Sequence, residues 1–109
     1  MDVGAVLIKL KSNALEHVES WKNELNERKQ EAIETLGAEK VSIESWFHVS
    51  LGGQDYLIAY MRAEDIAHAQ EIGRKSQFSI DQVHKAFKQN WEKVIPATLL
   101  IDLIHTEFP

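Results

Sequence analysis

The feature that most constrains this chain is the order of the hydrophobic patterns within its 109 residues. An apolar run near the start predicts a strand, and a stretch with helical periodicity follows it. Two alternating runs then flank a Gly-Gly turn, which predicts a β-hairpin. Two helical stretches and a last apolar run complete the order strand, helix, two strands, split helix, strand.

The first strand is expected over residues 3–11, where the sequence is apolar enough to be buried on both faces of a sheet. One long helix is expected from Asn13 to Leu36, because apolar residues recur there at helical spacing. Asn13 and Glu16 stand where a capping box needs them, and Gly37 suits the residue that ends a helix.

The predicted hairpin joins an alternating strand over residues 41–51 to a return strand over residues 56–62. Symmetric pairing around the turn places Leu51 opposite Tyr56 and Phe47 opposite Tyr60. We expect the face that holds Phe47 and Tyr60 to pack against helices. The other face, which holds Trp46 and His48, would then point to a dimer interface.

The last third of the chain predicts two helical segments and a strand. A helix is expected over residues 64–75, and a second one begins at Ser79 after an interruption. Apolar spacing continues this second segment through Val94, until Pro96 forbids further helix. Residues 97–108 then read as a long final strand.

This order predicts an α+β fold of the ferredoxin-like β-α-β-β-α-β type, formed by residues 1–109 as a single domain. Right-handed connections give a four-stranded antiparallel sheet with the helices on one face. Two observations then favour a homodimer. The edge strands are long and unprotected, and both sheet faces carry large apolar side chains.

The segments YMRAED at residues 60–65 and SIDQVHKAF at residues 79–87 resemble a bacterial family of small uncharacterised proteins. The arrangement of elements resembles the dimeric α/β-barrel superfamily. That resemblance implies a barrel formed by two sheets face to face, but it implies no single activity. The superfamily includes cofactor-free monooxygenases, haem-degrading enzymes, sugar mutarotases, lactone isomerases and members without catalysis.

Composition removes several classes of function. The net charge of −5 and the absence of a basic stripe argue against nucleic-acid binding. The chain has no cysteine, and its five histidines show no metal-binding spacing, so we expect neither a metal nor a cofactor. Neither a signal peptide nor a membrane-spanning run is recognisable, so we expect a cytoplasmic protein without a membrane partner.

His84 is the main candidate for a functional residue, because it shares the apolar side of its helix with Val83 and Phe87. It could act as a general base or bind a ligand in a cleft between helix and sheet. Asp81 could orient its ring, and the Tyr60 hydroxyl could contact it. Trp46 and His48 are the alternative pair, although a structural role is also open for each of these side chains.

Three functions remain open at this point. The protein could be a homodimer that binds a small organic ligand near His84 and Tyr60. It could be a monooxygenase-like or isomerase-like enzyme that uses His84 for acid–base chemistry. It could also be a dimer without catalysis or ligand. A cavity of roughly 300 Å³ or more at His84 would favour the first two functions.

Overall fold

The computed structural model describes residues 1–105 of the chain. Within them lie four strands, four helices and one 3-10 turn, so the predicted α+β class is confirmed. The elements, in chain order, are β1 Asp2–Leu10, α1 Leu15–Glu27, α2 Lys29–Ala38, β2 Val41–Leu51, β3 Gln54–Ala63, α3 Ile66–Lys75, α4 Ser79–Phe87, η1 Lys88–Asn90 and β4 Trp91–Pro96.

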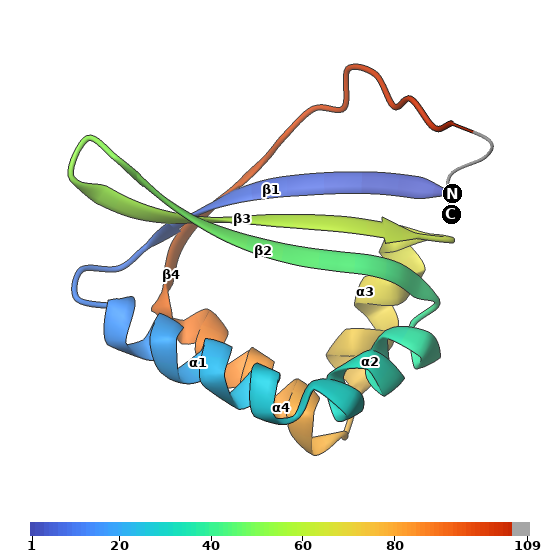
Figure 1. Cartoon of the computed structure of the whole chain (residues 1–109), viewed down its shortest axis with the longest axis horizontal. Coiled ribbons are helices and arrows are strands. Elements are labelled where there is room, and N and C mark those ends of the chain that lie inside the picture. The colour runs from blue at the N-terminus through green and yellow to red at the C-terminus, as the bar shows by residue number, and fades with distance from the viewer. Residues whose placement is uncertain (106–109) are drawn as a thin grey trace.

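The four strands form one antiparallel sheet in the order β2-β3-β1-β4, which confirms the predicted four-stranded antiparallel sheet. β1 and β3 are the inner strands, and β2 and β4 are the edges. All helices lie on one face of this sheet, whereas the chain after β4 runs over the other face (Figure 1). We call these the helix face and the open face.

The main hydrophobic core lies between the helix face and the first and last helices. Ile8 and Leu57 are the largest fully buried side chains of the sheet, and Trp21 of α1 and Phe87 of α4 cover them. The Trp21 and Phe87 rings are stacked, with their centroids 4.4 Å apart. This cluster fixes α1 and α4 side by side on the sheet.

The single helix expected from Asn13 to Leu36 is wrong, because the chain forms two helices that meet at Arg28. Arg28 leaves helical geometry with φ −111° and ψ 33°, and its guanidinium binds Glu24, Glu31 and Ser79. Asn13 does not cap α1, since it adopts a left-handed turn with φ 63°. None of the described helices is long and apolar enough to cross a membrane.

The end of the chain also differs from its prediction. The helix expected to continue through Val94 stops at Phe87, and Trp91–Pro96 forms β4 against β1. The apolar spacing of the β4 residues is compatible with a helix or with a strand. Pairing with β1, together with an ion pair between Lys9 and Glu92 (2.9 Å), favours the strand. Residues 97–105 form no strand, and residues 106–108 of the expected strand lie outside the described residues.

The hairpin prediction was right in its strands and wrong in its register and its buried face. The turn is Gly52-Gly53, so Leu51 pairs with Gln54, and Phe47 with Ile58. The observed pairing differs from the predicted one by two residues, so residues that were predicted to share a face of the sheet still share it. However, the face with Trp46 packs on the helices, and the one with Phe47 is open, with that side chain 56% exposed.

Candidate functional site

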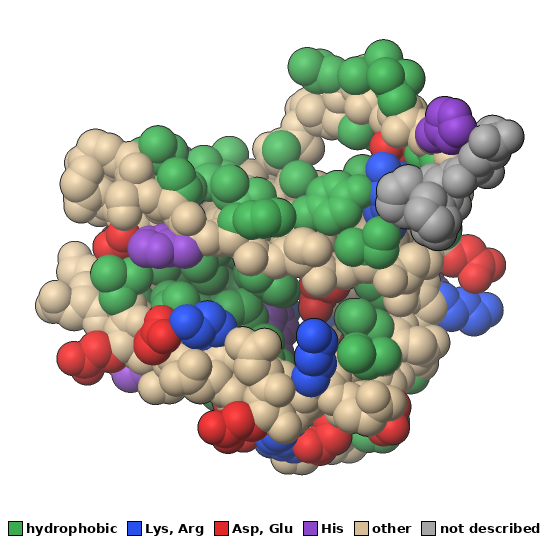
Figure 2. All heavy atoms as spheres, in the orientation of Figure 1, with side chains coloured by type: hydrophobic (Ala, Val, Ile, Leu, Met, Phe, Trp, Pro, Cys, Tyr) green, Lys and Arg blue, Asp and Glu red, His purple; other side chains and the backbone are tan. Residues whose placement is uncertain are grey.

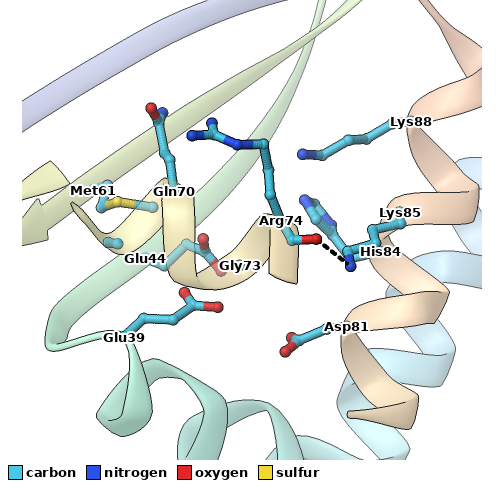
Figure 3. Close-up of a pocket in the computed structure, with 11 residues that line it drawn as sticks. Glu39, Glu44, Met61, Gln70, Gly73, Arg74, Asp81, His84, Lys85 and Lys88 are labelled. Carbon is cyan, nitrogen blue, oxygen red and sulfur yellow. Dashed lines mark hydrogen bonds between the residues drawn. The ribbon is translucent and has the colours of Figure 1, made fainter. Parts of the chain in front are cut away.

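A hollow of about 590 Å³ lies on the helix face, between the sheet and helices α3 and α4. We call it the His84 pocket, and it is bounded by charged groups as well as by Met61 and Gly73. Figure 3 shows how these side chains converge from three directions: from the loop and strand around β2, from α3, and from α4. The hollow exceeds the size that the sequence analysis required.

His84 enters this pocket from α4. Ile80 and Phe87, four residues before it and three residues after it, are buried, so the helical repeat turns His84 inward as well. Its ring lies against Trp46, with centroids 5.3 Å apart, and against Trp91, with centroids 6.0 Å apart. The sheet and the C-terminal part of the chain thus fix the ring within an aromatic wall.

The imidazole of His84 is neutral at physiological pH. Burial, together with the positive charge of Lys88, lowers its pKa to about 4. Within the described part of the chain, its ring nitrogens make no hydrogen bond. A neutral imidazole has one donor and one acceptor nitrogen, so both can serve a ligand. Its basicity is too low for an efficient general base near pH 7.

Two carboxyl groups on the wall opposite His84 have raised pKa values. Burial, and then the charges of Asp81 and Glu44, raise the pKa of Glu39 to about 7. The pKa of Glu44 is also raised, mainly because its carboxylate loses hydration in the hollow. Neither carboxyl group forms an ion pair with a described residue. Glu39 therefore exchanges its proton close to neutral pH.

Two further charged residues of the pocket, Asp81 and Lys85, form hydrogen bonds that stabilise the local structure. The Ser76 hydroxyl donates to the Asp81 carboxylate, which orders the connection between α3 and α4. Lys85 Nζ donates to the carbonyl oxygens of Arg74, at 2.9 Å, and Ser76, at 3.0 Å. These carbonyls lie at the end of α3, where no helical partner remains for them. Asp81 and Lys85 thus stabilise the wall of the pocket, and their charged groups are already engaged by other residues of the chain.

Lys88 supplies a cation at the edge of the pocket. Its ammonium lies 5.5 Å from the centre of the Trp91 ring, and no carboxylate of the described chain pairs with it. The pocket thus combines a neutral imidazole, a carboxyl group that titrates near pH 7 and a cation. Such a set fits a polar organic molecule with both donors and acceptors. The described residues include no cluster of three potential metal-binding side chains.

Of the residues predicted for the site, the pocket unites His84 and Asp81. However, the Asp81 carboxylate is engaged by Ser76 and does not orient the imidazole. Tyr60 is absent from the pocket, which corrects its expected contact with His84. It lies on the open face, where Arg62 donates from Nε to its hydroxyl. The expected contact is absent because the helices cover the sheet face that holds Trp46, and not the face that holds Tyr60.

The alternative pair separates in the structure. Trp46 packs directly against His84 and the edge of Trp21, so it belongs to the wall of the site rather than to a dimer interface. His48 lies near the hairpin end of the sheet, where its Nε2 is 2.9 Å from a carboxylate oxygen of Asp55. It is too exposed and too far along the strand to join the His84 pocket.

The site predicted from the sequence did not include Glu39, Glu44 or Lys88, which the pocket contains. A signal for Glu44 existed, because strand alternation puts it on the same face as Trp46. Assigning that face to the helices would have placed Glu44 beside α4. Glu39 lies between α2 and β2, and no periodicity predicts where a connecting residue points. Lys88 follows a helix that ended earlier than expected.

Comparison with known proteins places the chain in a family without an assigned activity. The model of a family of unknown function, DUF6176, matches residues 1–106. No curated protein and no solved structure matches the chain. The site must therefore be interpreted from its own geometry.

Proposed function

The chain belongs to the DUF6176 family, and we propose that it is a homodimer that binds a small polar molecule in the His84 pocket. The observation that carries this proposal is the hollow of about 590 Å³ against the imidazole. Pockets for small organic ligands have volumes of about 300–1,000 Å³ and contain a few convergent polar groups. A cytoplasmic location remains a prediction.

The chemistry of the wall indicates the kind of ligand. The imidazole of His84 and the carboxyl group of Glu39 have no hydrogen-bond partner among the described residues, although burial shifts the pKa of both. Polar groups in such places gain from a partner that replaces lost water. Met61 and the aromatic wall supply apolar contact. We therefore expect an uncharged or zwitterionic molecule with hydroxyl, amide or amine groups.

The proposed assembly follows from the open face of the sheet. Ile43, Phe47 and Leu51 are exposed on β2, and a second sheet packed against this face would cover them. We propose a ferredoxin-like arrangement of the dimeric α/β-barrel type, in which two such sheets meet face to face. Because the helices lie on the opposite face of the sheet (Figure 1), they and the His84 pocket would remain on the outside of such a barrel.

One observation favours an enzyme as the second candidate. Glu39 has a pKa of about 7, so it could give and take a proton near neutral pH without a cofactor. In that function Glu39, rather than His84, is the acid–base group. The imidazole, with a pKa of about 4, would orient the substrate through hydrogen bonds.

The test of ligand binding is chemical-shift mapping on ¹⁵N-labelled protein. The probes are water-soluble fragments that carry amide, hydroxyl or amine groups. We expect at least one of them to shift the signals of Gly73 and His84 in a saturable way. Signals of Gly52, in the hairpin turn, serve as an internal control. A complete absence of saturable shifts, or shifts confined to other surfaces, would contradict the proposal.

A further inference from the structure

The most exposed apolar segment of the chain follows β4. Residues 97–105, which we call the arm, form no helix or strand, and their large apolar side chains face solvent. Leu100 is 90% exposed and Leu103 is 82% exposed. Figure 2 shows these apolar side chains gathered on the projecting segment, apart from the helices. Apolar side chains are rarely exposed in a row unless a partner covers them.

The arm leaves its own sheet although the sheet could accommodate it. β4 pairs with β1 from Leu10 to Val6, and the last bond runs from the Ala97 amide to the Ala5 carbonyl, at 3.0 Å. β1 continues to Asp2, so part of its edge stays unused by the described residues of the arm. The chain therefore turns away from an available pairing.

An ion pair fixes the direction in which the arm runs. Arg62, on the open face of β3, donates from Nη1 to Asp102 Oδ2 at 3.1 Å, and the pair is partly exposed to solvent. The pair draws the arm over the open face of the sheet, on the side away from the helices (Figure 1). No described element of the chain covers the arm there, and its leucines and isoleucines are exposed.

The chain also carries a surface that fits such an arm. β2 is an outer strand of 11 residues, and its far edge pairs with nothing in the described chain. The open face beside it exposes Ile43 and Phe47. The arm of nine described residues spans about 30 Å when extended, close to the length of about 37 Å for β2.

We propose that the arm of each copy binds the outer edge of β2 and the adjacent open face of a second copy. This inference rests on the homodimer proposed above and adds how it is held together. A second copy is favoured over another protein, because one chain carries both an arm with exposed apolar side chains and an outer β2 edge that no described strand pairs with. A two-fold arrangement satisfies both pairs of surfaces at once and closes at two copies. Strand addition also satisfies backbone groups that an edge leaves open.

The first test is an intermolecular cross-link, which is clean because the chain has no cysteine. Two differently tagged variants, Ile101→Cys in the arm and Ser45→Cys on the open face of β2, are co-expressed and treated with a short bis-maleimide. We expect a product that carries both tags. The control pair is Ile101→Cys with Glu27→Cys, at the exposed end of α1, and should give no such product.

The second test replaces Leu99, Ile101 and Leu103 together by serine in the full-length chain. These side chains are exposed in the isolated chain, so the change should leave the fold of each copy intact. We expect the dimer dissociation constant, measured by sedimentation equilibrium, to rise about 100-fold or more, which corresponds to about 2.7 kcal/mol. Far-UV circular dichroism checks that the fold is retained.

The outcomes separate this inference from the dimer itself. A wild-type chain that is monomeric at micromolar concentration would overturn both. A wild-type dimer without the double-tagged product, and with unchanged affinity in the triple serine variant, would overturn the exchange of arms while the dimer stands. Ligand binding in the His84 pocket is measured separately and is unaffected by either result.

Discussion

Replacing Trp21 by alanine is expected to lower the free energy of unfolding by about 3–5 kcal/mol. Trp21 is 7% exposed, stacks on Phe87 and meets Trp46 edge to face at 5.1 Å. Its removal leaves a cavity between α1, α4 and the sheet, which neighbouring rings cannot fill without leaving their own contacts. It also removes one side of the aromatic wall behind His84.

Urea unfolding followed by circular dichroism at one fixed protein concentration measures this loss, since a dimer's stability depends on concentration. The matched control is Leu15→Ala in the same helix, where the side chain is 45% exposed. We expect that change to cost below about 1 kcal/mol. A loss for Trp21→Ala as small as that of the control would contradict the position of the core.

The second large effect concerns Glu39 and pH. Its pKa rises from 4.5 to about 7 on folding, so the folded state favours the protonated carboxyl group. Stability that depends on Glu39 is therefore fully present below pH 4.5 and is lost as the pH rises through 7. Glu39→Gln, which mimics the protonated form, should remove this loss.

We expect Glu39→Gln to match the wild type near pH 4.5 and to exceed its stability at pH 8. The full shift corresponds to about 3 kcal/mol, which screening of a partly exposed group reduces to about 1 kcal/mol. Unfolding curves at a series of pH values give the difference. Glu34→Gln, at an exposed position of α2, the helix that precedes Glu39, is the control for the removal of a surface charge. A constant difference between Glu39→Gln and wild type across this range would refute the raised pKa.

Much of the architecture could be predicted from local patterns. The apolar run of β1, the alternation of β2 and the helical spacing around His84 each reflect one strong periodicity. β1 and β2 formed where the sequence indicated them, and the helix around His84 began at the predicted Ser79 but ended earlier than predicted. The inward position of His84 could be predicted for the same reason, because it follows from the spacing of buried Ile80 and Phe87.

The errors arose where a pattern was compatible with two structures. β2 carries Phe47 on one face and Trp46 on the other, so alternation could not tell which face the helices cover. Trp91, Val94 and Ile95 suit a helix as well as a strand, and only pairing with β1 decides between them. Tyr60 shares a sheet face with Phe47, and that face was wrongly predicted to pack against the helices. The same error therefore placed Tyr60 in the predicted site.

The pocket itself could not be predicted, since it depends on how α3 and α4 stand away from the sheet. Glu39 and Lys88 enter it from positions that no motif marks. Their importance follows from the unusual pKa of Glu39 and from the effect of Lys88 on the pKa of His84. Predicting these pKa shifts requires the distances between elements that are far apart in the sequence.

If the His84 pocket binds a small molecule, a side chain that fills the pocket should weaken that binding. Gly73 lines the hollow, and a side chain added there would extend toward Glu39, whose carboxylate oxygen lies 3.3 Å from the position of an added Cβ. Gly37 is also helical but has open space around it. Leucine at either position improves helix propensity, so neither variant should lose its fold.

The measurement is the affinity of the fragments found by chemical-shift mapping, for the wild type, Gly73→Leu and Gly37→Leu. We expect binding at least about tenfold weaker, or about 1.4 kcal/mol, in Gly73→Leu, and unchanged binding in Gly37→Leu. Equal affinity for all three proteins would contradict this expectation.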